Sequence, residues 1–328
     1  MRRVMRSSGD LIADRRYQYG KALAQKGDLA AAAELFEQAL ERAPDWADAW
    51  VSLGRARRDL RDREGAAAAF REALRQDPGD ILGASLELAR LDARVTIDAA
   101  PLAYVKELFN SYAEDFDSAL VERLAYATPQ NLAAMVEALG GASGRHFPRA
   151  LDLGCGTGLA GEAFAAYAAW LEGVDVADAM VAAAREKGVY NRLACSDILS
   201  FLGASAHQYN LVIASDVFIY FRELTHLFSV VATKLAPQGL FTFSVERSTD
   251  AEIALRASLR FAHSANYVAT ALNRAGLELA NMEQAVLRQD RGTDVEGLLV
   301  VARKRADVMN DSVQQAGGTQ SPHIAKPN

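Results

Sequence analysis

LDLGCGTGLAG, residues 151–161, decides the fold class of this 328-residue chain. Its apolar beginning predicts a short buried strand that ends at Leu153, and the glycines after it predict a tight turn into a helix. Two glycine patterns overlap in it: GxGxG at Gly154, Gly156 and Gly158, and the dinucleotide-type GxGxxG at Gly156, Gly158 and Gly161. Because the first glycine of such a loop comes directly after its strand, the register favours GxGxG.

The sequence around this loop alternates short apolar runs with helical stretches from Pro148 onward. The strand candidates are ALDL at 150–153, LEGVD at 171–175, NRLAC at 191–195, NLVIAS at 210–215, GLFTFSV at 239–245, and two longer runs around 279–287 and 296–301. This alternation predicts an α/β fold with a doubly wound, Rossmann-like, mostly parallel sheet of seven strands.

The first hundred residues contain a repeat with a period of 34. Five residues, Gly20, Ala32, Phe36, Ala39 and Pro44, recur as Gly54, Ala66, Phe70, Ala73 and Pro78. Small residues let two helices approach closely, the aromatic residues fill grooves between helices, and proline ends the second helix. The segment resembles tetratricopeptide repeats, which implies an all-α recruitment or assembly module that contacts a protein partner or another part of the same chain. One further helix after Ile81 suits a cap, and because two repeats are few, we expect the module to pack against the rest of the chain.

These patterns predict five segments. We expect a disordered N-terminus at 1–12, repeats with a capping helix at 13–95, a linker with lid helices at 96–147, a catalytic domain at 148–304, and a disordered tail at 305–328.

Three aspartates come after successive strand candidates or lie within them. Asp152 lies inside the first strand and needs a partner if it is buried, which a cationic ligand would supply. Asp175 closes the second strand, where an acidic residue binds ribose hydroxyls. Substitution of Asp175 by alanine is expected to abolish cofactor binding and to leave thermal unfolding nearly unchanged. Asp197 comes after the third strand and could bind adenine, cap the next helix, or do both.

Together the glycine loop, these aspartates and the fifth-strand segment KLAPQGLFTFSVE resemble class I S-adenosylmethionine-dependent methyltransferases, and the whole chain is similar to predicted bacterial methyltransferases with N-terminal tetratricopeptide repeats. Asn210 and Gln238 depart from the family pattern outside the cofactor motifs. The resemblance implies S-adenosylmethionine as cofactor. The residues expected to bind it are Asp152, Gly154, Cys155, Gly156, Thr157, Gly158, Asp175, Val176, Ser196, Asp197, Ile198, Ser215 and Asp216, with Tyr112 and Phe116 on a lid helix. Phe109 is a third lid candidate on this stretch, and the alternative is an amphipathic helix that packs the three aromatic residues into the core.

The methyl acceptor is not identified by the sequence, and neither is a catalytic residue. Asp216, Tyr220, Glu246, His263 and Tyr267 are candidates for the acceptor side. An Asn-Pro-Pro-Tyr-like run is missing after the fourth strand, which disfavours methylation of amino groups on nucleic-acid bases or on protein glutamine. A small molecule or a protein is therefore the favoured methyl acceptor. A carboxylate acceptor would need no general base. Two alternatives stay open, a non-catalytic cofactor-binding scaffold and a nicotinamide-dependent oxidoreductase.

Composition limits which partners, metal sites and cellular compartment we expect for the protein. The net charge of −6 and pI near 5.5 argue against nucleic acid or an anionic membrane as the partner. Cys155 and Cys195 form no disulfide or zinc pattern, and the five histidines lack metal-ligand spacing. No apolar run suits a signal peptide or a membrane span, so we expect a cytoplasmic protein.

Overall fold

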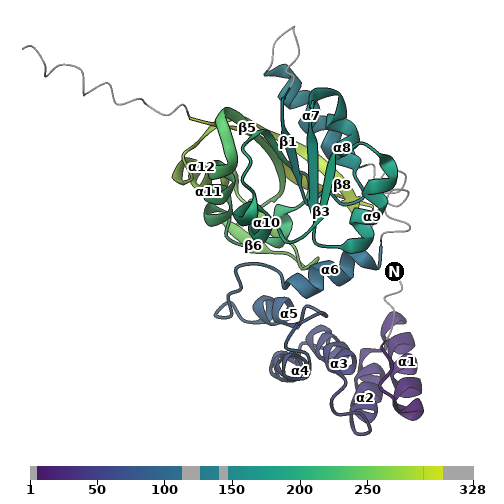
Figure 1. Ribbon diagram of the computed structural model, residues 1–328. Coiled ribbons are helices and arrows are strands. Elements are labelled where there is room, and N and C mark those ends of the chain that lie inside the picture. The colour runs from purple at the N-terminus through teal and green to yellow at the C-terminus, as the bar shows by residue number, and fades with distance from the viewer. Residues whose placement is uncertain (1–5, 113–125, 140–146, 291, 306–328) are drawn as a thin grey trace, which may run out of the picture.

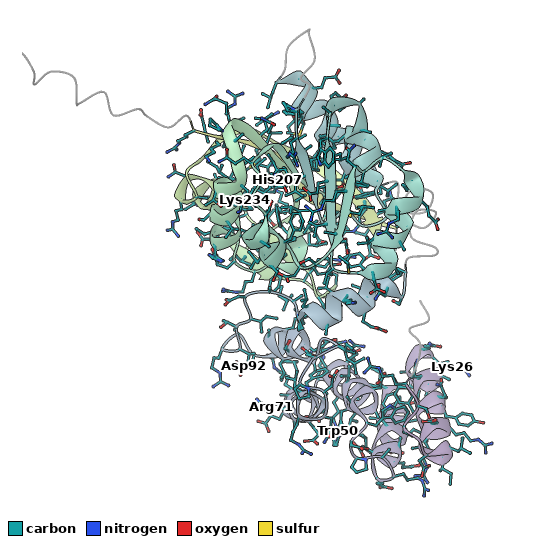
Figure 2. The ribbon with its side chains drawn as sticks, viewed as in Figure 1. Lys26, Trp50, Arg71, Asp92, His207 and Lys234 are labelled. Atoms are coloured by element: carbon teal, nitrogen blue, oxygen red, sulfur yellow. The ribbon has the colours of Figure 1, made fainter. Side chains whose placement is uncertain are left out.

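The structure is a computed structural model that describes residues 6–112, 126–139, 147–290 and 292–305. A helical array precedes an α/β domain, and helix α6 lies between the two (Figure 1). Figure 2 shows Trp50 and Arg71 on the array, and His207 and Lys234 on the α/β domain. The helices before the sheet are α1 (Leu11–Gln25), α2 (Leu29–Leu40), α3 (Ala47–Asp59), α4 (Arg63–Gln76), α5 (Ala84–Leu91), α6 (Leu102–Asn110) and α7 (Thr128–Ala138).

Helices α1 to α4 form two hairpins whose closest contact repeats with the sequence period. A Cβ atom added to Gly20 would lie 2.7 Å from the ring of Phe36, and one added to Gly54 would lie 2.6 Å from the ring of Phe70. The aromatic ring of the second helix therefore packs directly on the glycine of the first helix in both hairpins. This close approach is the physical reason for the glycine in each repeat.

The capping helix α5 joins the array to the α/β domain. Leu86 of α5 is fully buried in an apolar cluster that also contains Tyr104 of α6 and, from the α/β domain, Ile219 and Phe261. A Cβ atom on Gly83, just before α5, would lie 2.9 Å from the Tyr104 ring. The array is thus packed against the α/β domain, as expected for a module of two repeats.

The sheet is mostly parallel, and its nine strands within the described residues run in the order β3-β2-β1-β4-β5-β7-β6, with β9 pairing β5 and β8. The strands are β1 (Ala150–Leu153), β2 (Leu171–Asp175), β3 (Arg192–Cys195), β4 (Tyr209–Ala214), β5 (Leu235–Arg247), β6 (Ile253–Leu255), β7 (Phe261–His263), β8 (Leu277–Asp290) and β9 (Thr293–Lys304). The seven predicted strands are present as β1 to β5, β8 and β9.

The hairpin of β6 and β7 is an addition that the sequence pattern did not reveal. Strand β7 pairs in parallel with the end of β5, where Glu246 is opposite Ala262 and Arg247 is opposite His263. Each hairpin strand has only three residues, which is too short for a recognisable period. The turn between the two strands contains Arg256 and Arg260.

Helices cover both faces of the sheet. They are α8 (Leu159–Phe164), α9 (Asp178–Lys187), α10 (Ile198–Ala204), α11 (Thr225–Lys234) and α12 (Ala265–Arg274), with 3-10 turns at Ala165–Tyr167 and Phe218–Tyr220. One core contains Phe228 of α11 and Leu272 of α12. The other contains Leu132 of α7 and Phe164 of α8. Strands β1 and β4 contribute to both cores, so their carboxyl ends are held rigidly.

Candidate functional site

A cavity of about 340 Å³ lies at the carboxyl ends of the parallel strands. Strand β1 pairs with β2 on one side and with β4 on the other, so chain order reverses here. Ligands of open α/β sheets bind at such a switch point. Residues expected to bind the cofactor that line the cavity are Gly154, Cys155, Gly156, Thr157, Asp175, Val176, Ser196, Asp197, Ile198, Ser215 and Asp216.

The glycine loop lies between β1 and α8, directly beside the segment after β4. Gly154 and Gly156 have φ values of 67° and 53°, in the left-handed region that favours glycine. A Cβ atom on Gly154 would lie 2.5 Å from Cγ2 of Val217. The loop backbone can therefore approach a ligand closely only because these positions carry no side chain.

Asp175 binds the glycine loop as well as lining the cavity. Its Oδ2 accepts a hydrogen bond from the Gly156 amide at 2.9 Å, and its Oδ1 accepts one from the Ala177 amide at 2.8 Å. Burial raises the pKa of this carboxyl, whereas the backbone N–H groups lower it. Because Asp175→Ala would leave the N–H groups of Gly156 and Ala177 without this acceptor, these contacts predict a loss of stability as well as of cofactor binding, in contrast to the expectation from the sequence.

Asp152 is fully buried and does not line the cavity. Its Oδ2 accepts a hydrogen bond from the Tyr190 hydroxyl at 2.6 Å, and its Oδ1 has no hydrogen-bond partner among the described residues. Burial raises the pKa of Asp152 to about 7. Gly158 also stays outside the lining, and a Cβ atom on it would lie 3.2 Å from the Tyr190 ring. Both positions therefore face Tyr190 where a ligand contact was expected.

Asp197 has one of the two roles that the sequence left open, the helix cap, and its other role, adenine binding, stays a prediction. It lines the cavity, and it caps α10 because its Oδ1 accepts a hydrogen bond from the Ser200 amide at 2.9 Å. The backbone N–H of Ser200 holds the pKa of Asp197 below its ordinary value. The carboxylate is therefore charged and fixed in direction at the edge of the cavity.

Helix α6 covers the cavity from outside, and of the three aromatic lid candidates it brings Phe109 to the lining. Leu102, Val105 and Phe109 line it, and the Phe109 ring meets the Tyr220 ring edge-on at 5.7 Å. Tyr112 is not part of the lining, and Phe116 lies outside the described residues. The lid-like surface therefore includes Phe109 but not Tyr112.

Tyr126 and Ser215 form a hydrogen bond of 2.8 Å across the cavity wall. Burial raises the pKa of Tyr126 well above its ordinary value. Sequence reasoning missed Tyr126, because no local pattern links it to a residue at the end of β4.

A chain of charged side chains lies on the side of the cavity toward the β6–β7 hairpin. Asp216 accepts hydrogen bonds from Ser244 Oγ at 2.8 Å and from Arg288 Nη1 at 3.1 Å. Arg288 Nη2 donates to Glu246, and Arg260 Nη1 lies 3.8 Å from Oε1 of the same glutamate. Arg260 and Arg288 both line the cavity, whereas Glu246 lies behind them. No sequence pattern pointed to either arginine, since each comes from a segment far along the chain.

Of the acceptor-side candidates, Asp216 and Tyr220 line the cavity, and Glu246, His263 and Tyr267 do not. His263 is fully buried at the end of β7, its Nε2 lies 3.1 Å from the Arg222 carbonyl oxygen, and its ring stacks on Tyr267 at 5.5 Å. Burial lowers the pKa of His263 to about 4. His263 is therefore a neutral core residue in this fold and not a base that faces the cavity.

Comparison with known protein families matches both parts of the chain. Residues 150–239 match the model of a methyltransferase domain, and residues 17–81 match a tetratricopeptide-repeat model. A search of curated proteins finds no match. The family match confirms the prediction of a methyltransferase enzyme with S-adenosylmethionine as its cofactor.

Solved structures similar to this chain include several methyltransferases. The N-methyltransferase NodS from Bradyrhizobium japonicum WM9 is 21% identical over 54% of this chain and 94% of its own, with a TM-score of 0.43. The magnesium protoporphyrin IX methyltransferase ChlM from Synechocystis PCC 6803, solved with bound S-adenosylmethionine, is 19% identical over 62% of this chain and 96% of its own, with a TM-score of 0.47. A methyltransferase from Clostridium acetobutylicum ATCC 824 is 16% identical over 61% of this chain and 100% of its own, with a TM-score of 0.45.

Within the described ranges, no helix is long and apolar enough to cross a bilayer. The same residues contain no group of three or more histidine, cysteine, aspartate or glutamate side chains that could hold a metal ion. From the order of its parts and from the two family matches, the chain contains tetratricopeptide repeats and, after them, a methyltransferase domain.

Proposed function

We propose that this protein transfers a methyl group from S-adenosylmethionine to a small acceptor that binds inside the cavity, beside the β6–β7 hairpin. One observation carries the proposal. A single cavity has the glycine loop and Asp175 at one end, and an apolar wall with Arg260 at the other. A donor and an acceptor held at the two ends would share one enclosed space, which is the arrangement that direct transfer needs.

The residues at the first end suit the cofactor. Asp175 would accept hydrogen bonds from ribose hydroxyls, since a carboxylate has about four acceptor sites and the backbone uses two of them. Asp197 and Ile198 would border the adenine, and the backbone from Gly154 to Gly156 would border the amino-acid part. Asp152 has one carboxyl oxygen without a hydrogen-bond partner among the described residues, and when this group is ionised it would add negative potential where the cofactor carries an ammonium and a sulfonium.

The bound cofactor would supply an activated methyl group on a sulfonium leaving group. The protein's contribution is then to orient the acceptor and to keep water away from the reacting atoms. Leu102, Val105 and Phe109 of α6 close the cavity with apolar surface, and Tyr220 supports Phe109 edge-on. An acceptor small enough to enter below α6 fits this enclosure better than a folded protein does.

The repeats would bind a partner protein, which is the common use of such arrays. The cap of the array packs on the same apolar cluster that contains Tyr220 of the cavity wall. Cys155 and Cys195 are free thiols. A reducing, cytoplasmic setting therefore belongs to this proposal.

Calorimetric titration with S-adenosylmethionine, and separately with reduced nicotinamide cofactors, tests the cofactor end. We expect binding of the sulfonium compound alone. Asp175→Asn should weaken it by at least about tenfold, because hydrogen bonds to a charged group contribute about 1.5–3 kcal/mol. Glu186→Gln on the exposed side of α9 is the matched control and should bind like the wild type.

Three results would count against the proposal. Selective binding of a nicotinamide cofactor would indicate an oxidoreductase. Normal affinity in the Asp175 variant would remove that residue from the site. Tight cofactor binding with no methyl transfer to any compound in a broad acceptor screen would indicate a scaffold that keeps the cofactor as a structural element.

A further inference from the structure

Arg260 lines the cavity and forms no close ion pair among the described residues. The nearest carboxylate to it among the described residues is Glu246 at 3.8 Å, which is longer than a hydrogen bond. Burial opposes its charge, but Tyr220, Glu246 and Asp216 nearby raise its pKa, so the guanidinium stays protonated. A guanidinium that lines an apolar cavity without a close ion pair has donors to offer to an anionic ligand.

Arg288, unlike Arg260, forms close ion pairs. It is 5% exposed, it donates to Asp216 at 3.1 Å, and it donates to Glu246 as well. The two carboxylates and Arg288 together carry one negative charge. Arg260, at 3.8 Å from Glu246, balances that charge from a longer distance. Arg288 therefore holds the cluster together, and the Arg260 guanidinium keeps donors for the cavity that it lines.

The wall around Arg260 is apolar. Ala100, Ile219 and Phe221 line the cavity with Tyr220 and belong to the apolar cluster that contains Phe261, the residue after Arg260. Leu102 and Leu199 also line the cavity and are 53% and 38% exposed, so they add apolar surface where it opens to solvent. One fixed cation in such surroundings fits a ligand with an apolar body and one anionic group.

The carboxylates of the described lining already accept hydrogen bonds from other groups of the protein. The lining has no histidine or lysine among the described residues. Asp216 accepts from Ser244 and Arg288, Asp175 accepts from two amides, and Asp197 caps α10. Burial raises the pKa of Cys155 and of Tyr126. Such a site suits an acceptor atom that has no proton to lose.

We infer that the methyl acceptor is an apolar carboxylic acid, that Arg260 binds its carboxylate, and that a carboxylate oxygen receives the methyl group to give a methyl ester. This inference rests on the proposed function. A lone pair on the carboxylate oxygen forms the new C–O bond, the C–S bond of the sulfonium breaks, and its electron pair stays on sulfur. The products are the methyl ester and the neutral thioether, and no proton is transferred.

The electrostatics agree with this assignment. Each carboxylate oxygen has two lone pairs, so one can accept from the guanidinium while another attacks the methyl carbon. The carboxylate also brings the charge opposite to that of the sulfonium into a low-dielectric space. The product ester is neutral and loses its charge-assisted bond to Arg260, which favours its release.

The experiment measures binding of octanoate, 3-phenylpropanoate and indole-3-acetate, each against its own primary amide, with S-adenosylhomocysteine present. The acids should bind at least about tenfold more tightly than the amides. Arg260→Gln should abolish that preference and leave the Kd of S-adenosylmethionine unchanged. Arg260→Lys should restore part of it, because the charge remains while the planar fork is lost.

Arg247→Gln is the matched control, since Arg247 pairs with Glu296 at 3.1 Å and does not line the cavity. It should keep the acid preference. With wild type and S-adenosylmethionine, mass spectrometry should detect methyl esters of the acids that bind. The rate should be flat from about pH 6 to about pH 9, because the acceptor is already ionised there.

The outcomes separate this inference from the proposed function. If S-adenosylmethionine does not bind, the proposed function fails, and the acid-versus-amide comparison without cofactor still reports on Arg260. If the cofactor binds but no acid does, or amides bind equally, the inference is overturned. A weaker Kd for S-adenosylmethionine in Arg260→Gln would assign the arginine to the cofactor's own carboxylate and would overturn it too.

Discussion

The hydroxyl of Tyr190 donates a hydrogen bond of 2.6 Å to Oδ2 of Asp152, across 38 residues of sequence and directly behind the glycine loop. Tyr190 also fills the space beside Gly161, where a Cβ atom would lie 2.3 Å from the ring. Gly161, the last glycine of the GxGxxG pattern, therefore leaves the space that the Tyr190 ring occupies. The hydroxyl of the same residue is the hydrogen-bond donor to Asp152, whose carboxyl group has no access to solvent.

Asp152 should make unfolding dependent on pH in a direction unusual for an aspartate. Burial raises its pKa to about 7, so between about pH 4 and about pH 7 the native state holds a proton that the unfolded chain has lost. The group's contribution to the free energy of unfolding therefore falls as pH rises through this interval. From about pH 4 to about pH 7, the free energy of unfolding of Asp152→Asn should therefore rise relative to that of wild type by up to about 4 kcal/mol. Urea unfolding at several pH values measures this difference.

Tyr190→Phe provides the control for that titration. The tyrosine hydroxyl lowers the pKa of Asp152, so its removal should extend the fall in stability to higher pH. A difference between Asp152→Asn and wild type that stays constant with pH would show that the carboxyl does not titrate as described.

His263 should act in the opposite sense. Burial lowers its pKa to about 4, so between about pH 4 and about pH 6.5 the unfolded chain binds a proton that the native state excludes. The contribution of His263 to the free energy of unfolding is about 3 kcal/mol and is complete above about pH 6.5. It is lost as the pH falls toward about 4. His263→Gln should remove this acid-side loss, whereas His207→Gln at an exposed position (Figure 2) should retain it. Equal acid profiles for wild type and the His263 variant would refute the assignment.

Gly154→Ala should impair both folding and cofactor binding. The backbone at φ 67° costs an alanine about 1–2 kcal/mol, and the new methyl group would meet Val217 at 2.5 Å. Gly203→Ala in α10 is the control, because a Cβ atom there meets nothing within 4 Å and alanine favours the helix. Thermal unfolding should shift downward for the first variant and stay unchanged or shift upward for the second. Equal shifts would contradict the close packing of the loop.

Leu86→Ala tests the packing of the array on the α/β domain. Leu86 is fully buried between the two parts, so truncation should cost about 2–5 kcal/mol. Leu60→Ala, at a site that is 45% exposed, should cost less than about 1 kcal/mol. Urea unfolding monitored by circular dichroism compares them. A Leu86 variant as stable as the Leu60 variant would mean that the array and the domain are energetically independent.

Much of the fold could be predicted because its rules are local. The period of 34 places Gly20 on Phe36 and Gly54 on Phe70, and the alternation of apolar runs locates the seven main strands. The β6–β7 hairpin escaped prediction, since three-residue strands show no period and their pairing with β5 is set by distant contacts.

The sequence by itself determined the repeat array, the order of strands and helices, and the glycine loop, because backbone sterics and hydrophobic periodicity act over a few neighbouring residues. Only the tertiary structure decided which side chains meet at the acceptor end. Arg288 reaches Asp216 across 72 residues, and Asp152 turns to Tyr190 instead of the cavity. Whether a charge is neutralised or left to face a ligand depends on such distant encounters, so Arg260 could be recognised only in the folded chain.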